Sequence, residues 1–360
     1  MDQTEELEKA LGEKILVLDG AMGTTIRSYG LDEAAARGER FAENEKDLLN
    51  NGDILSVTKP DVIADIHKKF YEAGSDIVET NTFSATELAQ SEFFVEDPRE
   101  KGGRKDPEFF DGVLENEFLK ELAWDMNMKS SELARKMADD VGTDTGVKRY
   151  VAGAIGPLTV SLSNSPDAED AAFRVVNFDQ VLETYRRQVK GLIEGGCDIL
   201  MIETIFDSLN AKAAAVAVQE VFEEEGVKLP IIISAAVGMG GETMISAQKP
   251  GALWNAFAHV KPLAVGLNCS LGPDLMQPFL EELSGVAGTH ISAYPNAGLP
   301  NPLAPTGFDL EPPDMQKFMK DFAESGLINF AGGCCGNTPE HVKAIAEGVK
   351  DVEPRKVPGK

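Results

Sequence analysis

Eight short apolar runs, each of which leads into a turn rich in Gly, Asn or Pro, alternate with helical patterns along this chain of 360 residues. The runs cover residues 15–24, 76–83, 150–157, 198–207, 230–238, 263–273, 290–298 and 327–336. Near-continuous apolar runs are typical of parallel strands that are covered on both faces. Strand–helix alternation repeated eight times therefore predicts an α/β fold, a single-domain (β/α)8 TIM barrel.

Helical periodicity fills most of the segments between these runs. The expected helices cover residues 59–74, 178–196, 208–226, 273–285, 312–326 and 338–350. Pro60 suits the start of the first of these helices, and Gly74 suits its end. Asn177 is placed to cap the second. These start and stop signals support the helices that such a barrel needs.

Three segments lie outside the repeating pattern. Residues 1–14 are acidic and amphipathic, and we expect them to form a helical extension before the barrel, which we place at residues 15–350. An insertion is expected at about residues 92–149, where a charged, turn-rich stretch precedes a helical pattern that could be interrupted. Residues 351–360 are expected to form a C-terminal tail. No linker divides the chain, so we expect one folded domain.

The formal net charge of −26 argues against anionic partners, so neither nucleic acid nor a membrane surface is expected. The charge suits either solubility or an acidic face for a basic partner, and composition does not separate the two. No apolar run reaches about 18 residues, and the N-terminus lacks the basic start and apolar core of a signal peptide. We therefore expect a cytoplasmic protein, in which clustered cysteines act as metal ligands or catalytic groups.

The chemistry of such a barrel lies at the C-terminal ends of its strands. Cys269 stands at one such end in GLNCSLGP, and Cys334 and Cys335 stand at another in GGCCGNT. Adjacent residues of a regular strand point to opposite faces, so the neighbouring thiols can share one ligand only in an irregular turn, which the flanking glycines permit. Three thiolates on one Zn²⁺ leave the fourth tetrahedral position open, as in a catalytic site. Buried packing or a redox-active thiol pair are the alternatives, and Cys197, which precedes its strand, is expected in the core.

The same strand ends carry three acids, Asp19, Glu79 and Glu203. Zn²⁺ with three thiolates is a poor Lewis acid for water, but it would bind an incoming thiol as the thiolate, whereas a free thiol with a pKa of about 8.5 is mostly protonated at neutral pH. The acids could accept hydrogen bonds from an ammonium group, and the backbone amides of residues 20–25 could hold a carboxylate. The pattern predicts alkylation of an amino-acid thiol. The alternative role of each acid is a strand-end cap or an ion pair.

Seven motifs together resemble the homocysteine S-methyltransferase family: LDGAMGTTI, ETNTF, GPL, ETIFDSLNAKAA, GLNCSLGP, PNAGLPN and GGCCGNTPEH. The resemblance covers roughly residues 13–355 and is closest to the N-terminal homocysteine-binding module of cobalamin-dependent methionine synthase. It implies a (β/α)8 barrel that holds one Zn²⁺ on Cys269, Cys334 and Cys335 and methylates L-homocysteine to methionine. It also implies that the amino acid lies among Asp19, Gly20, Gly23, Thr24, Glu79, Glu203 and Asn268.

The motifs leave the methyl donor open. The chain has no Asp-x-His-x-x-Gly cobalamin signature, because DIHKK at residues 65–69 lacks the glycine. We expect methylcobalamin, carried by a separate corrinoid- or folate-binding protein or module, as the donor. A stand-alone enzyme that uses S-methylmethionine or betaine is the alternative. A non-catalytic barrel with structural zinc is a second alternative, and a closed site of three cysteines and His341 would indicate it.

Two segments depart from the pattern of the family. The stretch at residues 92–112 is longer than expected, and SAAVGMGGETMISAQ at residues 234–248 is only loosely typical. These departures concern the rim and the partner surface, and they leave the expected zinc ligands unaffected.

Overall fold

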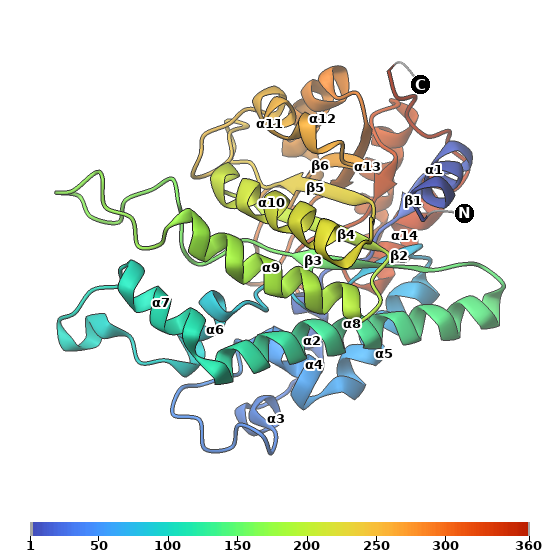
Figure 1. The fold of residues 1–360 in the computed structure, drawn as a ribbon. Coiled ribbons are helices and arrows are strands. Elements are labelled where there is room, and N and C mark those ends of the chain that lie inside the picture. Colours follow the sequence, from blue (N-terminus) through green and yellow to red (C-terminus); the bar gives the residue numbers. More distant parts are fainter. Residues whose placement is uncertain (1–2, 359–360) are drawn as a thin grey trace.

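In the computed structural model, which describes residues 3–358, eight parallel strands follow the order β1-β8-β7-β6-β5-β4-β3-β2 and bend into a nearly closed barrel (Figure 1). The strands are β1 (Leu16–Val17), β2 (Ile77–Glu79), β3 (Tyr150–Ile155), β4 (Ile199–Ile205), β5 (Ile231–Ala235), β6 (Ala264–Asn268), β7 (His290–Tyr294) and β8 (Phe330–Ala331). Each lies within one of the eight predicted apolar runs. The predicted TIM barrel is therefore confirmed.

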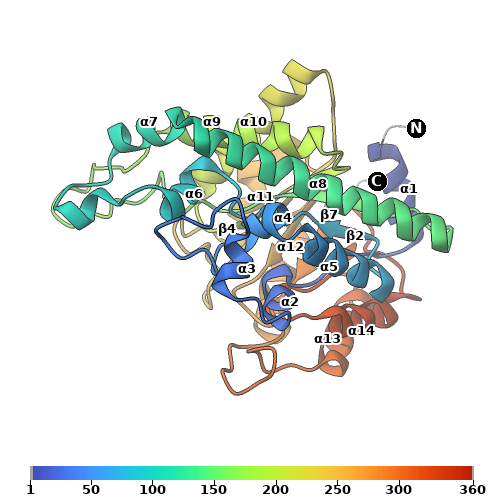
Figure 2. The ribbon, with the colours of Figure 1, turned by 90° about the horizontal axis from the view of Figure 1, so that it is seen from below.

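Helices surround the barrel, as the views from the side and from below show (Figures 1 and 2). The α-helices are α1 (Gln3–Glu13), α2 (Met22–Ser28), α3 (Glu33–Arg37), α4 (Leu55–Thr58), α5 (Pro60–Ala73), α6 (Glu87–Phe94), α7 (Pro107–Glu115), α8 (Glu117–Thr145), α9 (Phe178–Glu194), α10 (Ser208–Glu225), α11 (Pro250–Phe257), α12 (Pro273–Val286), α13 (Pro312–Glu324) and α14 (Pro339–Val349). The short 3-10 helices found within residues 3–358 are η1 (Gly52–Ile54), η2 (Pro98–Lys101) and η3 (Ala258–Val260). Gly74 ends α5 with φ +115, and the Asn177 side chain caps α9 by accepting from the Gln180 N–H at 2.9 Å, as predicted.

The seam between β1 and β2 is joined largely by carboxylate side chains. The Asp76 N–H donates to the Val17 carbonyl at 2.8 Å, and the Val17 N–H donates to Asp76 Oδ2 at 3.0 Å. One strand length further along, the Glu79 N–H donates to Asp19 Oδ2 at 2.9 Å. These bonds bring the C-terminal ends of β1 and β2 together at the mouth of the barrel.

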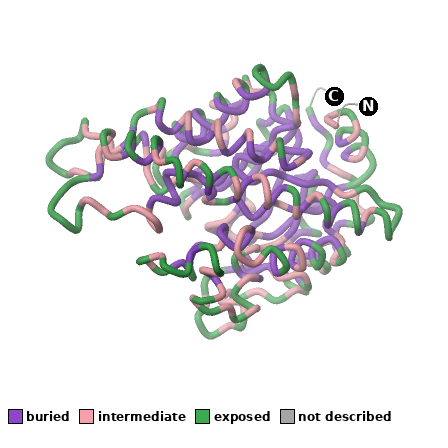
Figure 3. Tube along the Cα trace, turned by 60° about the horizontal axis from the view of Figure 1, so that its bottom comes forward, coloured by how far each residue is buried: buried purple, intermediate pink, exposed green. Residues whose placement is uncertain are grey.

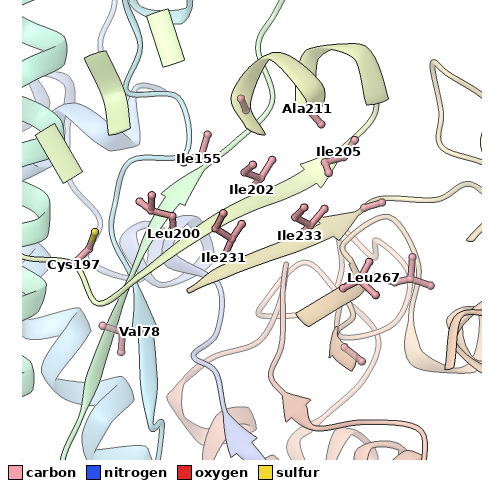
Figure 4. Close-up of a cluster of buried hydrophobic side chains, with 14 of the residues drawn as sticks. Val78, Ile155, Cys197, Leu200, Ile202, Ile205, Ala211, Ile231, Ile233 and Leu267 are labelled. Atoms are coloured by element: carbon pink, nitrogen blue, oxygen red, sulfur yellow. The ribbon is translucent and has the colours of Figure 1, made fainter. Parts of the chain in front are cut away.

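The core has an inner and an outer layer, because successive strand residues face opposite sides. On β4, Ile199 and Met201 belong to the cluster inside the barrel, whereas Leu200 and Ile202 belong to the cluster beneath the helices. Figure 4 shows part of this outer cluster, including Cys197, whose side chain is buried as predicted. Buried residues follow the strands, and exposed residues gather on the projecting loops (Figure 3).

Helix α1 bears out the expectation that the first residues are helical. Its Leu7 and Leu11 are buried and belong to the inner cluster together with Leu16 and Ile199. Residues 1–2 and 359–360, at the ends of the predicted extension and tail, lie outside the described residues. The boundaries 1–14, 15–350 and 351–360 stay predictions.

The predicted insertion at residues 92–149 is narrower than expected. Helix α8 packs between α5 and α9, so it takes the place of the barrel helix between β2 and β3 (Figure 1). Asn116 caps it and separates it from α7, and the long helix then runs without interruption. The part that leaves the helical layer runs from about residue 95 through α7, and it projects beside the loop at residues 157–177 (Figure 2). The two segments touch where Arg104 Cζ lies 3.2 Å from the centre of the Phe173 ring.

Among residues 3–358, no helix is both long enough and apolar enough to cross a membrane.

Candidate active site

A cavity of about 360 Å³ opens at the C-terminal ends of the strands. The predicted site residues that line it are Asp19, Gly20, Gly23, Thr24, Glu79, Glu203, Cys269, Cys334 and Cys335. They come from β2 and β4, from the turns that follow β1, β6 and β8, and from the start of α2, all of which the barrel brings to one rim. The structure therefore places together residues that lie more than 300 positions apart in the sequence.

The three thiols form one cluster. Their sulfur atoms all lie within 4.8 Å of one another, and Cys269 Sγ is 3.9 Å from Cys335 Sγ. A tetrahedral ion with Zn–S bonds of about 2.3 Å separates its sulfur ligands by about 3.8 Å. The spacing of the donor atoms therefore fits Zn²⁺, with the sulfurs on the cavity wall.

An irregular turn lets Cys334 and Cys335 face the same point, as predicted. Strand β8 ends at Ala331, after which the Cys334 N–H donates to the Pro295 carbonyl at 2.8 Å and the Ala297 N–H donates to the Cys335 carbonyl at 2.9 Å. Cys269 itself has φ +57, in the left-handed region, so its chain also leaves the strand direction at the sulfur. Both ligand segments are thus shaped away from regular strand geometry.

Hydrogen bonding within the cluster favours negative charge. Bonds from Cys269 and then from Cys334 lower the pKa of Cys335 to about 3, whereas hydrogen bonds to Cys269 and Cys335, followed by burial, raise the pKa of Cys334 well above 9. One thiolate is therefore stabilised by two thiols. Such a donor set suits a soft cation.

The three predicted acids face the same cavity. Burial, and then the charge of Asp19, raises the pKa of Glu79 to about 8. Burial also raises the pKa of Asp19 and of Glu203 well above their usual values. Within residues 3–358, none of the three forms an ion pair with Lys, Arg or His. Desolvated carboxyl groups without a cation favour their protonated forms, so the group can accept an external cation.

The family model described as homocysteine S-methyltransferase matches residues 16–349. The chain belongs to the homocysteine S-methyltransferase family. The resemblance that the motifs indicated is confirmed.

Solved structures of the homocysteine methyltransferase MmuM from Escherichia coli share the fold. The metallated form has a TM-score of 0.64 and 20% sequence identity, with 93% of this chain and 96% of that chain covered. The apo form has a TM-score of 0.60 and 19% identity over 93% of this chain and 96% of that chain. At this identity the likeness shows a shared fold.

Asn268 does not line the cavity of this family member, in contrast to the expectation from the motifs. Its Oδ1 accepts from the Thr204 N–H at 3.1 Å and from Ser234 Oγ at 2.7 Å, and its Nδ2 donates to Thr204 Oγ1 at 2.7 Å. Thr204 has φ +53 and follows Glu203 directly. Asn268 therefore holds the turn that presents Glu203, because its polar atoms are committed to neighbours within the fold.

His341 does not complete a closed zinc site. Its Nδ1 accepts from the Thr338 N–H at 3.2 Å, and its Nε2 lies 3.0 Å from the Leu310 carbonyl, to which it donates. Both ring nitrogens are therefore engaged at the start of α14. The metal-ligand cluster found among residues 3–358 contains the three cysteines alone.

Two buried residues at or near the cavity escaped prediction from the sequence: Asp53 lines it, and Asn337 holds the turn that carries the paired cysteines. Asp53, in η1, is buried, and burial raises its pKa to about 7, although its Oδ2 accepts from the Ser84 N–H at 2.5 Å. Asn337 is also buried, and its Nδ2 donates to the carbonyls of Pro295 and Cys334 at 3.1 and 3.0 Å. Asp53 lies in the segment between β1 and β2, away from any strand end, so the strand-end pattern did not indicate it. Asn337 stands two positions after Cys335, and its place in the GGCCGNT motif was the available signal.

Proposed function

We propose that this protein methylates the sulfur of L-homocysteine to give methionine, with Cys269, Cys334 and Cys335 holding one Zn²⁺ per chain. The observation that carries the proposal is the cavity of about 360 Å³ whose wall combines three clustered thiols with three acids that lack a cationic partner. Membership of the homocysteine S-methyltransferase family supports the same reaction. An amino-acid thiol matches both ends of this cavity.

The thiol end would hold the reacting sulfur. Zn²⁺ bound by three thiolates would keep the substrate sulfur as a thiolate, which is the nucleophilic form. The turns at Cys269 and at Cys334–Cys335 keep the three ligands preorganised, because backbone hydrogen bonds hold both segments.

The acid end would hold the substrate ammonium group. Glu79 and Glu203 lie in a buried, low-dielectric site, so a bound ammonium would favour their carboxylate forms and displace protons. Asp19 contributes charge while its Oδ2 also receives the Glu79 N–H at 2.9 Å. Asn268 acts indirectly by fixing the Thr204 turn next to Glu203.

For the donor, we propose methylcobalamin on a separate corrinoid- or folate-binding protein or module. Two observations support this donor: the motifs are most similar to those of cobalamin-dependent methionine synthase, and the cavity lies at the mouth of the barrel. S-methylmethionine and betaine are the alternative donors, and both carry a methyl group on a cation. The aromatic rings that line the cavity are those of Phe83, Phe93 and Tyr294. Such rings can attract a cationic methyl group, so the donors must be compared directly.

The test is a methyl-transfer assay with zinc-loaded protein and homocysteine, in which free methylcobalamin, S-methylmethionine and betaine are supplied separately. We expect methionine from methylcobalamin and little or none from betaine. Turnover with betaine or S-methylmethionine, and none with methylcobalamin in free or protein-bound form, would overturn the donor and leave the homocysteine reaction intact. No methionine from any donor, together with no binding of homocysteine, would overturn the proposed function.

A further inference from the structure

Phe83 is an aromatic side chain that stands exposed on the wall of the active-site cavity. It belongs to the ETNTF motif after β2, and the residue is 41% exposed. Among the large apolar side chains that are exposed within residues 3–358, it is the one that lines this cavity. Because apolar surface is stabilised by removal from water, a ligand that covers the ring would gain binding free energy from it.

The backbone before Phe83 is fixed by buried hydrogen bonds. The Asn81 N–H donates to Ser130 Oγ on α8 at 2.7 Å, and Thr82 Oγ1 donates to the Ala154 carbonyl on β3 at 2.7 Å. Both Asn81 and Thr82 are themselves buried. The exposure of Phe83 is therefore a property of a firmly held segment.

Asp53 and Gly156 set the place of Phe83 itself. Asp53 Oδ2 accepts from the Ser84 N–H at 2.5 Å, and the Phe83 backbone donates a hydrogen bond to the same buried carboxyl group. A Cβ atom at position 156 would lie 2.2 Å from the Phe83 carbonyl oxygen and 3.0 Å from two atoms of its ring. Glycine in the GPL motif after β3 therefore leaves the space that Phe83 occupies. A buried acid and a glycine from two other segments thus fix the position of one exposed ring.

The methyl donor is the ligand that remains for this ring. In the proposed function, the thiols and the acids hold homocysteine, and the donor must reach the substrate sulfur through the mouth of the cavity. Phe83 lines the same cavity as the three cysteines and is also open to solvent. A donor that enters from solvent therefore meets the Phe83 ring.

We infer that the methyl donor packs an apolar surface against Phe83 and that Asp53 is a positioning residue, which acts on the donor through Phe83. The inference rests on the proposed function, because it assigns a contact to the donor of that reaction. The corrin ring of methylcobalamin offers a broad, largely apolar face, which another apolar side chain of similar size can also cover. A sulfonium or quaternary ammonium donor would instead depend on the π-electrons of the aromatic ring.

The experiment measures methionine formation against the concentration of free methylcobalamin at saturating homocysteine. In Phe83→Ala, we expect the KM for methylcobalamin to rise about 5- to 20-fold with kcat retained, because the lost contact is made equally in the ground state and the transition state. Phe83→Leu keeps an apolar contact without the π face, so it should recover most of the loss. Zinc content and the calorimetric affinity for homocysteine should be unchanged in both variants.

Phe118→Ala is the matched control. Phe118 is 42% exposed, like Phe83, but it lies in α8 and does not line the cavity. The KM for methylcobalamin should stay at the wild-type value in this variant.

A double-mutant cycle tests the role of Asp53. Asp53→Asn replaces one acceptor oxygen by an amide nitrogen beside the backbone donors of Phe83 and Ser84, and it should raise the KM for methylcobalamin about 2- to 5-fold. In the Phe83→Ala background, the same change should add no further increase, because Asp53 acts through Phe83. An equal increase in both backgrounds would overturn the positioning role.

An unchanged KM in Phe83→Ala, or an equal rise in Phe118→Ala, would overturn the inference and leave the proposed function standing. No recovery in Phe83→Leu would overturn the apolar contact, as would turnover of wild-type protein with S-methylmethionine or betaine but not with methylcobalamin. If wild-type protein forms methionine from none of these donors and binds no homocysteine, the proposed function is overturned as well.

Discussion

Both ends of the barrel carry acids and cysteines, but the acids at one end form ion pairs within residues 3–358 and those at the other end do not. At the N-terminal ends of the strands, Asp76 accepts from Lys14 Nζ at 2.6 Å, and Asp198 accepts from Arg135 Nη1 at 2.6 Å. Cys197 lies at this end as well, packed in the outer core apart from the three clustered cysteines. Asp76 and Asp198 thus have cationic partners from the fold, and Cys197 is packed among apolar side chains.

At the C-terminal ends, acids and clustered thiols line one cavity. Glu203 is buried and Glu79 is partly buried, yet no Lys, Arg or His of residues 3–358 forms an ion pair with either of them. The thiols of Cys269, Cys334 and Cys335 form a cluster within 4.8 Å. The comparison teaches that pairing, more than burial or residue type, separates an acid that stabilises this barrel from one that awaits a ligand.

The largest expected effect concerns the cysteines of the two ends. Alanine at Cys269, Cys334 or Cys335 should remove most of the bound zinc, because each change deletes one of three protein ligands. Alanine at Cys197 should leave about one zinc per chain. Metal analysis of the purified variants measures this. Metal loss in the Cys197 variant with retention in the Cys269 variant would reverse our assignment of the two ends.

A paired acid should matter to stability. In Asp198→Asn, Arg135 loses its buried partner, and we expect the free energy of unfolding to fall by about 2–3 kcal/mol, less than for a fully buried pair because Arg135 is partly exposed. Denaturant unfolding gives this value, and homocysteine affinity of the folded variant should be unchanged. A variant as stable as wild type but unable to bind homocysteine would contradict the structural role of Asp198.

An unpaired acid should matter to binding. Glu203→Gln should retain zinc but lose a charge-assisted hydrogen bond to the substrate ammonium, which is worth about 1.5–3 kcal/mol or roughly 10- to 150-fold in affinity. Calorimetric titration with homocysteine measures the loss. Unchanged affinity would assign Glu203 to the fold, like Asp198, and would remove the contrast between the two ends.

The smallest expected effect is a difference in protons released on binding. The pKa of Glu79 is raised to about 8, so Glu79 is mostly protonated at pH 7 and should lose its proton when an ammonium binds. The substrate thiol should release about one further proton as it becomes a thiolate. Wild-type protein should therefore release more protons at pH 7 than Glu79→Gln.

Titrations at pH 7 in buffers of different ionisation enthalpy count these protons. The difference between wild type and Glu79→Gln should vanish well above pH 8, where the carboxyl group is already ionised. Because the pKa of Glu79 is raised in the folded protein, its protonated form contributes to the stability of the substrate-free protein at low pH. This contribution to the free energy of unfolding should be lost as the pH rises through about 8. Equal proton release by both proteins at pH 7 would show that Glu79 already has a cationic partner.

Much of the architecture was predictable because it depends on local periodicity. Apolar runs and cap residues such as Asn177 and Gly74 marked strands and helices within the chain itself. The helix from Glu117 onward was harder to place, because the charged, turn-rich segment before it hid its membership in the barrel layer.

The sequence by itself determined the barrel, the thiols and the acids, because strand ends and glycine-flanked cysteines are visible in short stretches. Only the tertiary structure decided which polar atoms remain free once the barrel closes. Asn268 forms its hydrogen bonds with Thr204 and Ser234, and His341 forms its hydrogen bonds with Thr338 and Leu310. A hydrogen bond is satisfied by whichever partner lies nearest in space, and these partners come from segments that are distant in the chain.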